Sequence, residues 1–109
     1  MLVHPNLTIA TSLTGRHALI VPAGEIDMDS VPDLDRILDA CLAHRPVAIH
    51  VDMHAVAFCD CRGLNAFVRA HRLARGIGAT LWLYDTTPIV TRLLFLTGTD
   101  VLLATALAA

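Results

Sequence analysis

Residues 47–64, VAIHVDMHAVAFCDCRGL, decide the fold of this 109-residue chain. The stretch opens with VAIHV, whose β-branched side chains favour a strand. A polar break and a second apolar run, AVAF, lead to a polar turn at residues 59–63. From Leu64 onward, apolar residues recur at helical spacing. The stretch therefore predicts a strand, a tight turn and a helix whose N-terminus faces outward, and partners of open α/β sheets tend to gather at such ends.

The residues before this stretch predict a β-hairpin and a helix. Two apolar runs at residues 7–13 and 17–24 flank a turn at residues 14–16, and Pro22 is expected at the end of its strand or at a bulge because it has no N–H. An amphipathic helix follows and ends near Pro46, with Ser30 or Asp29 expected as its cap.

After the central turn, the pattern alternates between helix and strand. It predicts helices at residues 62–75 and 88–97, a strand at 79–84, and a last short helix at 101–109. A strand, a helix and another strand in succession imply a parallel crossover. We therefore expect one α/β domain over residues 1–109. It would be a small mixed four-stranded sheet, made of an N-terminal hairpin and parallel strands and packed with three to four helices.

Composition narrows the classes of function. Apolar residues make up 55% and charged residues 17%, and the net charge is −2 with a pI near 6.3, so the overall charge does not indicate nucleic-acid binding. All eight basic residues are arginines, which suit acidic protein partners. Three cysteines and no signal-peptide pattern favour free thiols and a cytoplasmic location. No run approaches the length of a membrane span, so we expect no membrane partner.

Several motifs, in order along the chain, resemble those of the STAS domain, the fold of bacterial anti-sigma-factor antagonists. Residues 24–27, Gly-Glu-Ile-Asp, match the turn that follows the hairpin in that family. Residues 88–103, PIVTRLLFLTGTDVLL, resemble its closing stretch. The central motif is matched by Val51, Asp52, Val56, Phe58, Asp60, Gly63 and Leu64. The resemblance covers nearly the whole chain and implies a STAS-like α/β fold.

The resemblance also implies a regulatory function. In phosphoregulated members, the first Ser of an Asp-Ser-Ser-Gly turn takes phosphate from a kinase that is also the anti-sigma factor. The unphosphorylated form binds that kinase and frees the sigma factor. Here Cys61 stands at the phosphoacceptor position and Arg62 at the second Ser. A thiol is a poor acceptor for such a switch, so the sequence argues against phosphorylation control at this turn.

The resemblance and the helix predicted at residues 62–75, which carries Arg62, Arg69, Arg72 and Arg75, together predict a partner-binding surface. Its partner would be an anti-sigma factor of the serine-kinase type, bound by competition with the sigma factor. No catalytic residue, metal or cofactor is predicted. The predicted contact residues are Asp27, Asp29, Ser30, Asp60, Cys61, Arg62, Gly63, Asn65 and Arg69.

Other interpretations of the turn stay open at this point. The chain could be a non-switching STAS subunit of a larger regulatory assembly. It could also be a redox sensor or a thiol-dependent transferase that uses Cys61. Cys59 and Cys61, with His50 or His54, could contribute to a metal site, although two thiols fall short of the usual four ligands and alternation turns Cys59 inward. The row of arginines on the helix is either a solvated face or a docking surface for an acidic partner.

Overall fold

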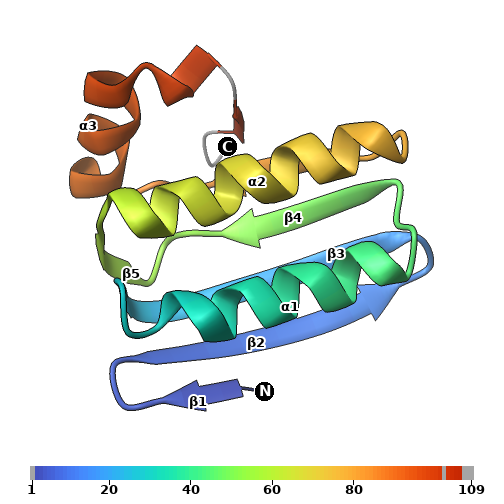
Figure 1. Cartoon of the computed structure of the whole chain (residues 1–109), viewed down its shortest axis with the longest axis horizontal. Helices are drawn as coiled ribbons and strands as arrows, with labels where there is room; N and C mark the ends of the chain where they lie inside the picture. The colour runs from blue at the N-terminus through green and yellow to red at the C-terminus, as the bar shows by residue number, and fades with distance from the viewer. Residues whose placement is uncertain (1, 102, 107–109) are drawn as a thin grey trace.

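The structure, a computed structural model, describes residues 2–101 and 103–106, which form one mixed sheet flanked by helices (Figure 1). The strands are β1 (Leu2–His4), β2 (Leu7–Thr14), β3 (His17–Ile26), β4 (Ala48–Asp52), β5 (Val56–Cys59), β6 (Thr80–Tyr84) and β7 (Ala104–Ala106). The helices are α1 (Val31–Ala43), α2 (Cys61–Gly76), α3 (Pro88–Thr97) and the short 3-10 helix η1 (Thr99–Val101).

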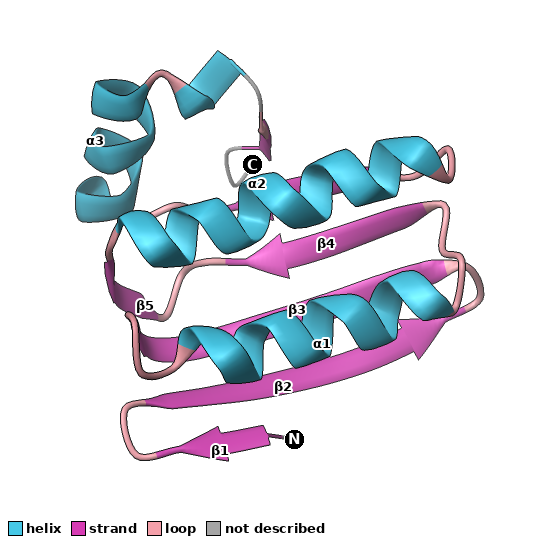
Figure 2. Cartoon of the chain, viewed as in Figure 1, coloured by secondary structure: helices cyan, strands magenta, loops and turns pink. Residues whose placement is uncertain are grey.

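The sheet combines an antiparallel and a parallel half. Its strand order is β1-β2-β3-β4-β6-β7, and β5 pairs with β3 beyond the end of β4. The strands β1, β2 and β3 run antiparallel, whereas β3, β4, β6 and β7 are parallel neighbours. The helices α1 and α2 lie side by side over one face of the sheet (Figure 2). This mixed α/β architecture confirms the predicted fold class.

The number of strands differs from the prediction, because seven strands form among the described residues instead of four. The strands β1 and β5 are too short to show a clear period in the sequence. The predicted last helix is wrong: residues 99–101 form η1, and residues 104–106 form β7, which pairs with β6. Of the other residues in that predicted helix, residue 103 forms a bend, and residues 102 and 107–109 lie outside the described residues.

Pro22 was predicted at a strand end or at a bulge, but it lies inside β3, and the irregularity of this strand falls between Gly24 and Glu25. The parallel neighbour of β3 changes here: Ile20 pairs with Val51 of β4, and the next paired residue, Gly24, faces Val56 of β5. The N–H of Gly24 bonds to the β5 side of the strand, so the nitrogen of Pro22, two residues earlier, faces the same side. Pro22 pairs with Ile9 of β2 on its other side, but on this side no strand among the described residues pairs with it, so the missing donor costs no ladder hydrogen bond.

The core lies between the sheet and the two helices. Alternate residues of β3, β4 and β6 point toward α1 and α2, and the largest of these side chains are fully buried. From the strands come Ile20, Ile49, Val51, Leu81 and Leu83, and from the helices come Leu34, Leu38 and Phe67. Among the described residues, no helix has both the length and the hydropathy to cross a bilayer.

His71 is the exception on the apolar face of α2. Its side chain is buried, and its Nδ1 has no hydrogen-bond partner among the described residues. Burial lowers the pKa of His71, and the positive charges of Arg75 and Arg72 lower it further. A proton on this imidazole is therefore held less tightly in the folded chain than in the unfolded chain, so acidification below the ordinary histidine pKa favours unfolding.

Replacing His71 with Leu is expected to stabilise the fold. The variant removes an unsatisfied buried nitrogen, which we expect to raise the free energy of unfolding by about 1 kcal/mol at pH 7.5. The gain should be larger at pH 5.5, because the wild type then loses stability through protonation of His71 and the variant does not. Urea unfolding at the two pH values measures the difference, and an equal gain at both would contradict the titration argument.

Candidate functional site

Two loops meet at one end of the sheet, where β3 and β5 both finish. The strands are in register at Ile26 and Cys59, and the N–H of Asp60 donates to the carbonyl of Ile26 over 3.1 Å. The chain therefore leaves β3 and β5 at neighbouring points. We call residues 27–30 the acidic loop and residues 60–63 the turn. Figure 1 shows that α1 and α2 begin at this same end.

The acidic loop is held by its own hydrogen bonds. Oδ1 of Asp27 accepts the N–H groups of Asp29 at 3.0 Å and Ser30 at 3.1 Å. Oγ of Ser30 donates to the carbonyl of Glu25 at 2.9 Å and accepts the N–H of Asp27 at 3.0 Å. Ser30 occupies the N-cap position of α1, one of the two residues predicted there, but its side chain makes no capping hydrogen bond to the first turn of the helix. Asp27 and Ser30 instead shape the loop that presents Asp29 to solvent.

The turn is held by a helix cap and by close packing. Oδ1 of Asp60 accepts the N–H of Gly63 at 2.9 Å, which satisfies one free donor at the start of α2. Gly63 is buried against the end of β3. A Cβ atom on it would lie 2.5 Å from Cγ2 of Ile26 and 2.8 Å from Sγ of Cys59. Cys61 and Arg62, which lie between Asp60 and Gly63 in the sequence, are exposed.

A groove of about 330 Å³ connects the two loops along the starts of α1 and α2. Arg62, Asn65 and Arg69 of α2 line one wall, spaced three and four residues apart so that they share one helix face. Met28 of the acidic loop lies at the other wall and is 57% exposed. The remaining lining residues are Val31, Pro32, Asp35 and Ala66.

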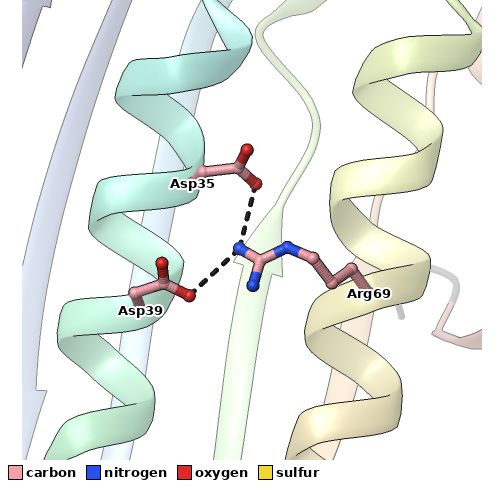
Figure 3. Close-up of polar contacts among 3 residues, drawn as sticks. All are labelled: Asp35, Asp39 and Arg69. Carbon is pink, nitrogen blue, oxygen red and sulfur yellow. Dashed lines mark hydrogen bonds and ion pairs between the residues drawn. The ribbon is translucent and has the colours of Figure 1, made fainter.

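Arg69 joins the two helices. One of its guanidinium nitrogens lies 3.1 Å from Oδ1 of Asp35 and 3.0 Å from Oδ1 of Asp39, both on α1 (Figure 3). Partial burial acts to lower the pKa of Arg69, but the hydrogen bonds and charges of the two carboxylates outweigh it and raise the pKa. Arg69 was predicted to contact a partner, and the structure shows that its charge is already paired within the chain.

Replacing Arg69 with Gln should cost less than about 1 kcal/mol of unfolding free energy. The side chain of Arg69 is 42% exposed, and water screens ion pairs at such positions. Urea unfolding at low and at high salt would measure this cost, which should shrink as the salt concentration rises. A loss above 2 kcal/mol that is independent of salt would contradict a surface ion pair.

The two thiols near the turn point in different directions. Cys59 is buried, and burial, followed by the charges of Asp60 and Cys61, raises its pKa to about 12. Cys59 is therefore a protonated thiol of the core, while Cys61 is exposed. His50 bonds to His17 and Tyr84, and His54 bonds to Asp52. Within residues 2–101 and 103–106, no three His, Cys, Asp or Glu side chains form a group that could hold a metal ion.

The predicted contact residues are thus near one another but differ in accessibility. Ser30 and Gly63 are buried, and they hold the loops in place through the hydroxyl of Ser30 and the backbone N–H of Gly63. Asp27 and Asp60 are half-buried and bonded to their own loops. Sequence reasoning missed Met28, because an apolar residue between two acidic ones carries no signal of its own. The exposed members of the predicted set are Asp29, Cys61, Arg62, Asn65 and Arg69.

Comparison with protein families and solved structures places this geometry among known folds. The family model STAS_2, described as "Mlab, STAS domain", matches residues 9–104. An anti-sigma factor antagonist from Mycobacterium paratuberculosis is 26% identical, with a TM-score of 0.80 over 95% of this chain and 89% of that chain. Among curated proteins, no sequence matches this chain.

Two structures of the anti-sigma factor antagonist SpoIIAA share the fold at lower identity. Its unphosphorylated form is 17% identical, with a TM-score of 0.81 over 94% of this chain and 89% of that chain. The phosphorylated form from Bacillus is 14% identical, with a TM-score of 0.76 over 94% of this chain and 92% of that chain. At these identities the likeness is one of fold.

Proposed function

Because this chain belongs to the STAS domain family, we propose that it acts as an anti-sigma factor antagonist that binds an anti-sigma factor of the kinase type and thereby releases a sigma factor. The observation that carries the proposal is the accessible turn. Cys61 and Arg62 project from a rigid corner that is continuous with the groove along α1 and α2. The structural likeness to proteins described as anti-sigma factor antagonists supports this function.

The contact surface in this proposal consists of Met28 and Asp29, the exposed residues of the turn, and the groove. It offers an apolar side chain at Met28 and a free cation at Arg62, since no carboxylate pairs with Arg62 among the described residues. An acidic group on the partner would complement Arg62, and an apolar group would cover Met28. Binding alone excludes the sigma factor, so no chemistry on this chain is required.

We also propose that binding is not switched by phosphate at this turn. The position implied by the family resemblance holds Cys61, whose thiol lacks the hydroxyl that accepts phosphate in the phosphoregulated members. The surface would then hold its partner whatever the supply of ATP. The thiol-based alternatives need a base or a second accessible thiol near Cys61, and Cys59 is buried. The binding function is therefore the better supported one.

Mixing the purified chain with a kinase-type anti-sigma factor from the same organism tests both parts of the proposal. We expect a complex on size-exclusion chromatography and displacement of a bound sigma factor. Radiolabelled ATP should leave the wild-type chain unlabelled, and Cys61→Ser is the variant in which labelling could appear. Failure to bind any such factor would contradict the proposed function, and labelling of the wild-type chain at Cys61 would contradict the absence of a phosphate switch.

A further inference from the structure

The helix α3 is apolar on the side that faces solvent as well as on the side that faces the core. Val90 and Leu94 are buried beneath it. On the outward side, Ile89 is 56%, Phe95 76% and Leu96 71% exposed. A helix on the surface of a globular domain normally carries polar residues on its outer face, and one that is apolar all round is normally buried. The outward face of α3 is therefore apolar enough to be buried, but no other part of the described residues packs against it.

The outward face is hollowed as well as apolar. A groove of about 650 Å³ runs along it, lined by Thr86, Pro88, Thr91, Arg92, Phe95 and Leu96. Positions 88, 92, 95 and 96 lie on one side of the helix by their three- and four-residue spacing. Contiguous exposed apolar surface of this kind marks interaction sites in soluble domains. Figure 1 shows α3 near the start of α2, on the side of α2 opposite α1.

Charge narrows the choice of occupant. Arg92 lies in the middle of the outward face, and it makes no ion pair with the described residues. In a two-fold symmetric dimer that buried this whole face, Arg92 would lie against Arg92 of the second copy. Both guanidinium groups would be desolvated without a carboxylate partner, which is unfavourable. A partner with a carboxylate opposite Arg92 and aliphatic side chains on either side of it avoids that cost.

We propose that the outward face of α3 docks an amphipathic helix of another protein, with aliphatic residues flanking a single carboxylate that meets Arg92. This mode of recognition lays the apolar face of one helix into a groove, with anchors three to four residues apart. Phe95 and Leu96 provide the apolar contact area. The ion pair with Arg92 fixes the position of the bound helix along the groove. The proposal concerns a surface separate from the turn and does not rest on the function proposed above.

A pair of designed peptides tests the proposal on the full chain. The first is an 18-residue helix-forming peptide with leucines at helical spacing and one Glu at the centre of that face, and its twin carries Lys instead. By fluorescence anisotropy, the Glu peptide should bind the wild type at least tenfold more tightly than the Lys peptide. Arg92→Glu should reverse the preference, and Phe95→Ser should abolish binding of both. Leu73→Ser, at a 47% exposed position of α2, is the matched control and should bind like the wild type.

Four outcomes would overturn the proposal. Equal binding of the two peptides would show that Arg92 does not select a carboxylate. Binding unchanged by Phe95→Ser would show that the peptide does not bind to the outward face of α3. Sedimentation of the wild type as a dimer that Phe95→Ser dissociates would assign the face to a second copy. Flotation with anionic lipid vesicles that depends on Phe95 would assign it to a membrane. The variants change exposed side chains only, and unchanged melting temperatures confirm that each remains folded.

Discussion

Replacing Gly63 with Ala is expected to lower the free energy of unfolding by about 2 kcal/mol, which corresponds to a fall of roughly 10 °C in the melting temperature. The added Cβ would lie 2.5 Å from Cγ2 of Ile26, 2.8 Å from Sγ of Cys59 and 3.2 Å from the backbone oxygen of Ile26. The first two contacts are too close for carbon and sulfur. The third involves backbone that is fixed in the sheet, so the start of α2 must move away from β3.

The same helix provides the matched control for this variant. Gly76 ends α2, and a Cβ atom on it would meet nothing within 4 Å. Gly76→Ala should therefore leave stability unchanged or raise it by up to about 1 kcal/mol, because Ala is the better helix former. Thermal unfolding of the two variants under identical conditions measures the contrast. Equal stabilities would contradict the tight packing beneath the turn.

Replacing Arg62 with Glu is expected to weaken binding of the anti-sigma factor about 100-fold. Arg62 is exposed beside the groove, and in the proposed complex it meets an acidic group of the partner. Reversing its charge would place two like charges together at the interface, which costs several kcal/mol. Glu in the first turn of a helix is favourable, so the variant should fold normally. The loss would therefore come from the interface.

Arg72 is the control for the charge reversal. It is exposed on the same helix but lies ten residues further on, about 15 Å along the helix axis. Arg72→Glu changes the net charge by the same amount and should alter affinity no more than about threefold at physiological salt. Titration calorimetry with the three chains measures both effects. A similar loss for both variants would indicate a general charge effect and contradict a contact at Arg62.

The sequence predicts the centre of the fold well and its margins poorly. The runs that form β2, β3, β4 and β6 carry strong periods, and so do the three α-helices. Residues 104–106, Ala-Thr-Ala, carry no such signal, because small residues fit a helix and a strand alike. They form β7 through pairing with β6, whose edge residues 82–84 supply the partner. That contact is tertiary, so no local pattern in residues 101–109 could indicate it.

The candidate site, like the fold, could be predicted from the sequence only in part. Residues 59–64 predict an exposed turn at the start of a helix, and the structure shows Cys61 and Arg62 there. Sequence alone cannot tell that Ser30 is buried, because its burial depends on the position of α1 over the sheet. It also cannot show that Arg69 faces Asp35 and Asp39, which lie 34 and 30 residues away. Motifs thus indicate where the site lies, and packing decides which side chains remain free to bind.

The most direct test of this account is a competition measurement. A fluorescent sigma factor is bound to its kinase-type anti-sigma factor, and the chain is added in the presence of ATP while anisotropy reports release of the sigma factor. We expect the wild type to release the sigma factor, and we expect the release not to decay even though ATP is present. Arg62→Glu should need about 100 times more protein for the same release. Release that decays as the chain becomes phosphorylated, or release by Arg62→Glu equal to that by the wild type, would contradict it.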